Sequence, residues 1–266
     1  MTTIDETATS GATRREFVTR LGAAGLGVAA GALLAGCGGS SSNSASASTN
    51  QDGTILNAAA TAEALATVMY FNIINGPIFK SLSTNTADQA YLVAGFEQEL
   101  NHYNFLVANG GAALATTFYF PTNMFTDPQT TLNTLITLED AFIAAYLIGI
   151  RDFSTPGLKV IAGQILGVES EHRTLGRVIA NDLGLSTVSG LAGAESVKPP
   201  TAASNNLAFE RTFTSALPDI SHVVTALGPF VASGSTGYST TPFTFATASA
   251  SPSAGQTAVV LNATTP

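Results

Sequence analysis

Hydrophobic residues recur every three or four positions over four long stretches of the chain. This spacing predicts four helices, each with an apolar face. The stretches lie at about 54–80, 86–109, 129–152 and 155–183. Asp52 and Thr54 open the first stretch, and Gly184 closes the fourth. Small polar residues and glycine are typical of helix starts and ends, so these positions support the proposed boundaries.

The connections between the four predicted helices are short, long and short. The long one contains Phe118-Tyr119-Phe120-Pro121 and Asp127-Pro128. A four-helix bundle with one long crossover in its middle differs from a simple up-and-down bundle. The sequence therefore predicts an all-α domain over residues 53–184 with this crossover.

Beyond residue 185 the composition changes to Ser, Thr, Ala, Gly and Pro. An apolar stretch at about 218–231 predicts a short fifth helix, with Pro218 in its first turn. Residues 241–247 and 257–261 have the composition of β-strands. We expect residues 185–266 to form a Ser/Thr-rich appendage that is partly β-structured or loose.

The amino terminus has the pattern of an export signal. Arg14 and Arg15 are followed by an apolar residue two positions on, which resembles the twin-arginine signal. A weakly apolar stretch then ends in Leu34-Ala35-Gly36-Cys37, which resembles a lipoprotein cleavage site. We expect residues 1–36 to be this signal, Cys37 to carry a lipid, and residues 37–52 to be a flexible linker. The alternative is a simply cleaved signal with an incidental cysteine.

Composition excludes some functions. Only 11% of the 266 residues are charged, and the net charge is −8. A chain with so few Lys and Arg is a poor candidate for binding nucleic acid. The single Cys excludes internal disulfides and zinc or iron sites built from several thiolates.

The helices carry a candidate metal site. Two of the three histidines stand in Glu-x-x-His units, Glu99 to His102 and Glu169 to His172. Residues three apart share one face of a helix, so each unit can direct a carboxylate and an imidazole to the same point. Helices one and three each contain a lone glutamate among apolar residues, Glu63 and Glu139. An unpaired buried carboxylate costs several kcal/mol, roughly, and a cation removes that cost.

Other acidic residues near these positions have simpler interpretations. Glu97 and Glu171 lie about 160° around the helix from Glu99 and Glu169, so we expect them in solvent. Asp140 is either a surface residue or a partner for a histidine N–H. The third histidine repeats the spacing, as Asp219 to His222, but no lone glutamate remains to complete a second site.

These residues resemble the ferritin-like superfamily, and in particular the exported bacterial ferritin-like proteins related to desiccation-associated proteins. The resemblance implies a site for two iron ions, or two manganese ions, with Glu99 and Glu169 bridging. Its ligands would be Glu63, Glu99, His102, Glu139, Glu169 and His172. Tyr70, Tyr103 and Tyr146 could stand near the site, but aromatic core packing is the role that we favour for each.

Two functions remain open at this stage. The first is metal oxidation, or chemistry with O2 or peroxide, by an exported protein anchored by lipid in the cell envelope. The second is a non-catalytic envelope protein, connected with stress or desiccation, that uses the same bundle. The sequence indicates neither the electron donor nor the oligomeric state.

Overall fold

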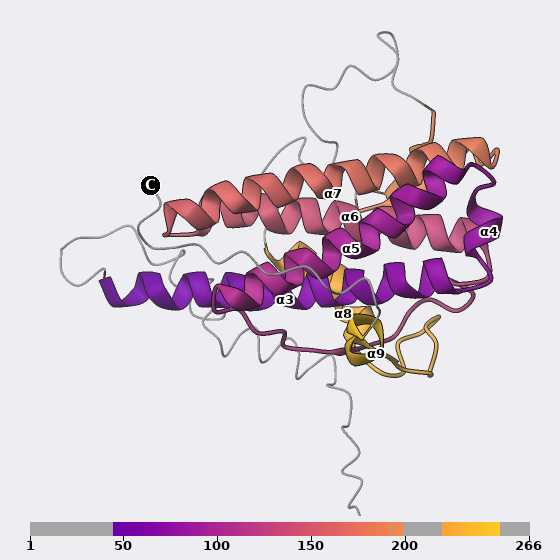
Figure 1. The fold of residues 1–266 in the computed structure, drawn as a ribbon. Coiled ribbons are helices and arrows are strands. Elements are labelled where there is room, and N and C mark those ends of the chain that lie inside the picture. Colours follow the sequence, from indigo (N-terminus) through magenta and orange to yellow (C-terminus); the bar gives the residue numbers. More distant parts are fainter. Residues whose placement is uncertain (1–44, 192, 199–219, 251–266) are drawn as a thin grey trace, which may run out of the picture.

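Four long helices lie side by side along a common axis (Figure 1). They are α3 (Ala45–Asn75), α5 (Thr86–Ala108), α6 (Pro128–Asp152) and α7 (Pro156–Asp182). The structure, a computed structural model, describes residues 45–191, 193–198 and 220–250. α3 packs against α5, and α6 packs against α7. The predicted helical bundle is confirmed.

Capping side chains or prolines mark the starts of α5, α6 and α7, close to where the sequence predicts them. The Asn85 side chain accepts a hydrogen bond from the backbone N–H of Ala87 at the start of α5. Asp127 does the same for Thr130 at the start of α6, which has a proline in its first turn, as α7 also does. Such caps satisfy backbone N–H groups that the first helical turn leaves unpaired. The bounds of α5, α6 and α7 therefore lie within a residue or two of the prediction.

The first helix differs from the prediction at both ends. α3 begins at Ala45, inside the range assigned to the linker, and ends at Asn75 instead of about residue 80. Pro77 disfavours a helical conformation for the residue before it. The chain turns at Gly76, where a side chain would meet the Asn72 carbonyl oxygen at 2.5 Å. The predicted remainder of the helix is a separate short one, α4 (Phe79–Leu82).

Asp52 has a different role from the one the sequence suggests. It lies within α3 and not at the start of it. Its carboxylate accepts hydrogen bonds from the backbone N–H and hydroxyl groups of Ser154 and Thr155, which precede α7. Asp52 therefore caps the fourth helix and ties it to the first.

α6 is largely buried. It is long and apolar enough to span a membrane by composition alone, but 72% of the apolar window lies inside the protein. It contacts α3, α7, α8 (Ile220–Val231) and β2 (Thr187–Gly190). These contacts give α6 the surroundings of a core helix.

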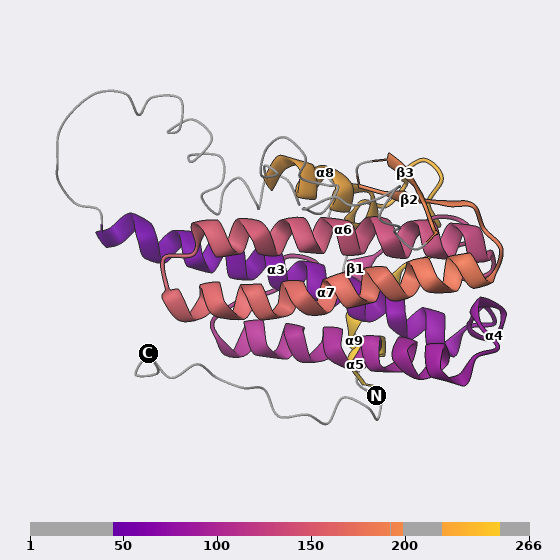
Figure 2. The same cartoon turned by 90° about the horizontal axis from the view of Figure 1, so that it is seen from above.

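The described residues beyond 185, which are 186–198 except 192 and then 220–250, pack on the bundle. β2 and β3 (Gly193–Ser196) form an antiparallel hairpin beside α6 (Figure 2). The predicted fifth helix is present as α8, whereas the strand expected at 241–247 is short. Only β4 (Phe243–Thr244) is a strand there, and α9 (Phe245–Ser249) follows it directly. The strand expected at 257–261 lies outside the described residues.

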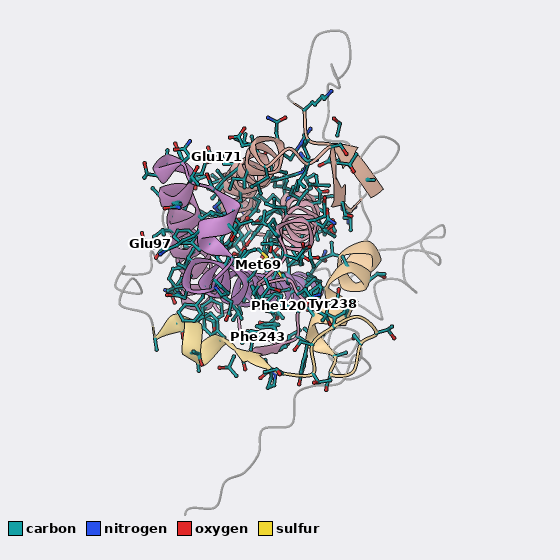
Figure 3. The ribbon with its side chains drawn as sticks, turned by 90° about the vertical axis from the view of Figure 1, so that its right-hand side faces the viewer. Met69, Glu97, Phe120, Glu171, Tyr238 and Phe243 are labelled. Carbon is teal, nitrogen blue, oxygen red and sulfur yellow. The ribbon has the colours of Figure 1, made fainter. Side chains whose placement is uncertain are left out.

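The long crossover, residues 109–127, runs along the outside of the bundle and is held by this later segment (Figure 1). Its strand β1 (Thr117–Phe118) pairs with β4. The Tyr119 N–H donates to the Phe230 carbonyl in α8, and the Ser239 N–H donates to the Phe120 carbonyl. Phe120 also packs edge-on against Phe230 and Phe243, near Tyr238 (Figure 3). The carboxy-terminal segment is thus part of the core.

Candidate metal centre

Six buried or nearly buried side chains from the four long helices meet in the middle of the bundle. One glutamate comes from each of α3 and α6, and one Glu-x-x-His unit comes from each of α5 and α7. They are Glu63, Glu99, His102, Glu139, Glu169 and His172. The four carboxylates are at most 1% exposed. The structure therefore brings together all the residues that the sequence singles out inside the helices.

The six side chains form two overlapping groups. Glu63, His102, Glu99 and Glu169 offer ligand atoms that lie within 4.8 Å of one another, and so do Glu139, His172 and the same two glutamates. In the first group, His102 Nδ1 lies 3.4 Å from Glu63 Oε2 and 3.3 Å from Glu169 Oε1. In the second, His172 Nδ1 lies 2.8 Å from Glu99 Oε1 and 3.4 Å from Glu169 Oε2. Glu99 and Glu169 are shared, which is the arrangement that two bridging carboxylates need.

The buried polar atoms of this cluster lack hydrogen-bond partners. Among the described residues, eight of the nine buried side-chain nitrogen and oxygen atoms without such a partner belong to the six residues. Both oxygens of Glu99 and Glu169 are among them, but only one oxygen of Glu63 and of Glu139. Buried polar groups are normally satisfied, so this concentration of buried donor atoms is suited to binding a cation. The donor set of carboxylate oxygens and imidazole nitrogens fits iron or manganese.

Two tyrosines hold the remaining oxygens of the unshared glutamates. The Tyr70 hydroxyl donates to Glu139 Oε1 at 2.7 Å, and the Tyr146 hydroxyl donates to Glu63 Oε1. Each tyrosine stands seven residues after one glutamate and binds the other. Tyr70 and Tyr146 are buried core residues, as predicted, and in addition they hold two glutamates of the cluster. Tyr103 does behave as a core residue and packs against Phe245.

The electrostatics are those of carboxylates crowded in a dry interior. Burial, reinforced by the other carboxylates, raises the pKa of Glu63 well above its usual range, and burial also raises the pKa of Glu139. Burial opposes ionisation of Glu99 too, but the charge of His172 and hydrogen bonds from neighbouring side chains together outweigh it and lower the pKa of Glu99. Burial disfavours the imidazolium of His172, yet Glu99 and its neighbours raise the pKa of His172 to about 11. Protons thus balance the charge here when no metal does.

The other acidic residues near the cluster differ in their exposure to solvent. Glu171 is exposed and Glu97 half-buried, and both point outwards from the bundle (Figure 3). Asp140 is neither on the surface nor bonded to a histidine. It is buried, pairs with Arg173 and accepts a hydrogen bond from the Leu191 N–H. Helical spacing does not predict this ion pair, because Asp140 and Arg173 stand on different helices.

Two more residues complete the surroundings. Glu195 of β3 forms the second ion pair of Arg173, at 2.9 Å. Gln98 Oε1 lies 2.9 Å from Nε2 of His172. Neither follows from helical spacing, since each contact joins two different elements. Arg14, Arg15, Cys37 and the side chain of His222 lie outside the described residues.

Comparison with known proteins agrees with this geometry. No curated protein and no solved structure matches the chain. A model of the ferritin-like domain family matches residues 51–182, which span the four long helices and all six clustered side chains. Residues 51–182 of this chain therefore match the ferritin-like domain family, and their helices carry acidic and histidine groups compatible with a metal site.

Proposed function

We propose that the protein binds two iron ions, or two manganese ions, and uses them for metal oxidation or for chemistry with O2 or peroxide. The observation that carries the proposal is the set of eight unpartnered buried atoms on six residues. Four carboxylates would neutralise the charge of two divalent ions. The chain would then avoid the cost of leaving several carboxylates buried without a cation.

Each residue would have a distinct task. Glu99 and Glu169, with both oxygens available, would bridge the two ions. Glu63 and Glu139 would bind through Oε2, because their other oxygens accept hydrogen bonds from Tyr146 and Tyr70.

The histidines would bind through Nδ1, the nitrogen that faces the carboxylates. Two bound ions would supply one-electron redox chemistry. Metal binding would also release protons from the histidines and the raised-pKa glutamates.

The decisive experiment is elemental analysis of full-length protein purified from its native host, followed by stopped-flow oxidation of added Fe(II). We expect about two metal ions per chain, in line with sites of this architecture. Glu63→Ala and His172→Ala should each lower the metal content and abolish oxidation, whereas Glu171→Ala, on the exposed surface, should change neither. Absence of stoichiometric metal would overturn the proposal. Metal-independent folding without turnover would favour a non-catalytic envelope protein.

We further propose that the protein is exported by the twin-arginine route and anchored by lipid at Cys37. The support is the sequence pattern around Arg14, Arg15 and Cys37. Metabolic labelling with a radioactive fatty acid tests it directly. Label should enter the wild-type chain and not Cys37→Ser, and Arg14→Lys combined with Arg15→Lys should keep the protein in the cytoplasm. Equal labelling of the Cys37→Ser chain would contradict the anchor.

A further inference from the structure

The two halves of the metal cluster repeat the same ligands in different surroundings. The residue after the lone glutamate is Ala64 in one half and Asp140 in the other. The residue after the histidine is Tyr103 in one half and Arg173 in the other. Equivalent ligands are therefore followed by apolar or aromatic residues on α3 and α5, and by an ion pair on α6 and α7.

The histidine of the second half is held from both sides. His172 presents Nδ1 to the glutamates and Nε2 to Gln98 Oε1, 2.9 Å away. An amide oxygen only accepts hydrogen bonds, so the proton on Nε2 donates to Gln98. The following residue, Arg173, is buried between Asp140 and Glu195. These contacts fix the ring and its helix against α5, α6 and the hairpin. A hydrogen bond from the other ring nitrogen fixes the tautomer and strengthens a histidine ligand.

The histidine of the first half lacks this support. Gln98 precedes Glu99, and the equivalent residue before Glu169 is Val168, which has no hydrogen-bond acceptor in its side chain. Within the described part of the chain, Nε2 of His102 has no contact like that between His172 and Gln98. The His102 side chain is also more exposed, at 12% against 5% for His172.

We propose that the two metal positions are unequal: the one at His172 binds a divalent cation first and retains it, and the one at His102 exchanges its cation with solvent. Gln98 is the positioning residue that sets this order. The inference rests on the proposed function and adds an order of filling to it. It assigns the exchange of metal to the half of the cluster that lies nearer to solvent.

The order is tested by titrating metal-free, full-length protein with Co(II) and following its visible absorption. We expect His102→Ala to keep the tighter binding step and lose the weaker one. His172→Ala should lose the tighter step and bind its remaining ion more weakly than the wild type binds its first. The opposite assignment, or equal loss in the two variants, would overturn the inference.

The role of Gln98 is tested separately in the same titration. Gln98→Leu should weaken the tighter step by about 10-fold to 100-fold, as expected when the partner of a ligating histidine is removed. Gln98→Glu keeps an acceptor and should restore the tighter step, and Val168→Leu should alter neither step. Circular dichroism of each metal-free variant checks that it folds.

The two proposals can fail independently. No Co(II) binding by the wild-type chain would refute the metal site itself. Binding of two ions with no effect of Gln98→Leu, in a variant that folds, would refute only the inequality and leave the metal site standing.

Discussion

Tyr70 and Tyr146 show how single side chains complete the cluster. Each phenol is buried and donates a hydrogen bond to one of the two unshared glutamates. Tyr70 donates to Glu139, and Tyr146 donates to Glu63. Helical spacing predicts which glutamates and histidines share a face, because that depends on one helix alone. It does not predict these hydrogen bonds, because they depend on how two helices are rotated against each other. The Glu-to-Tyr spacing of seven residues, present twice, is the signal in the sequence that corresponds to them.

Tyr146→Phe removes the donor to Glu63 and leaves that oxygen buried without a partner. We expect the affinity for metal to fall by about 10-fold, the lower end of the range for groups that orient metal ligands. Competition with a chromophoric chelator measures the change. Tyr103→Phe is the matched control, because Tyr103 packs against Phe245 and is only half-buried. Equal affinities in wild type and Tyr146→Phe would contradict this role.

Arg173 balances two buried carboxylates, Asp140 and Glu195. Burial raises the pKa of Asp140 to about 6 despite the attraction of Arg173, so Asp140 is ionised at neutral pH. Arg173→Leu should lower the free energy of unfolding by about 3–5 kcal/mol, the usual cost of breaking a buried pair. Urea denaturation of metal-free protein measures it.

The control for Arg173 removes the charges together. Asp140→Asn, Arg173→Leu and Glu195→Gln combined should recover most of the lost stability, because no buried charge is then left unpaired. A loss below about 1 kcal/mol in Arg173→Leu alone, the value typical of an exposed pair, would mean that the carboxylates find other partners.

At the scale of elements, the helices with clear local caps are the ones predicted closely. The start of α3 was missed because its first residues, Ala-Ser-Ala-Ser-Thr-Asn, have the composition of a linker. The sequence does not predict the hairpin β2–β3, because each strand has only four residues and most of their side chains are small or polar. Its register depends on contacts with the bundle, such as that between Ser189 N–H and Asn133. Local signals define helix ends, whereas long-range contacts define these strands.

Asp52 gives a pH-dependent contribution to the α3–α7 contact. Burial opposes ionisation, but hydrogen bonds from Ser154 and Thr155 outweigh it and lower the pKa of Asp52. A lowered pKa in the folded state stabilises the protein above the unfolded value, about 3.9, and this stability is lost as the pH falls through the folded pKa. Asp52→Ala should therefore cost about 1 kcal/mol at pH 7, like the loss of a helix cap. The difference from wild type should shrink below about pH 4.

Urea unfolding of both chains between pH 7 and pH 3 measures this dependence. Asp182→Ala serves as a control for a general charge effect, because Asp182 is exposed at the end of α7. A difference between Asp52→Ala and wild type that stays constant down to pH 3 would contradict the assignment of the titration to Asp52.

At the scale of the whole molecule, one arrangement of helices serves both core and site. The order of short, long and short connections predicts which helices pair, and the structure has α3 with α5 and α6 with α7. The packing of residues 220–250 against the crossover could not be predicted. The crossover has no regular hydrophobic periodicity, and its Phe120 packs against aromatic residues of α8 and β4.

Metal should stabilise the whole bundle, since the six ligands come from all four long helices. At a free metal concentration of about 1,000 times the dissociation constant, binding adds about 4 kcal/mol to the free energy of unfolding. Calorimetry of loaded and chelator-treated protein should show a higher Tm for the loaded form. Glu139→Gln should reduce that difference and Glu171→Ala should not. An unchanged Tm in protein that contains stoichiometric metal would contradict the expectation.

The pairing of β1 with β4 has a consequence for the order of folding. Thr117 and Thr244 are neighbours in the sheet although the helices α6, α7 and α8 lie between them in sequence. Contacts between such distant residues close large loops and form late. During synthesis, all six clustered residues have left the ribosome well before residue 243. The cluster can therefore assemble while the crossover is still uncovered, and residues 220–250 then close over the crossover.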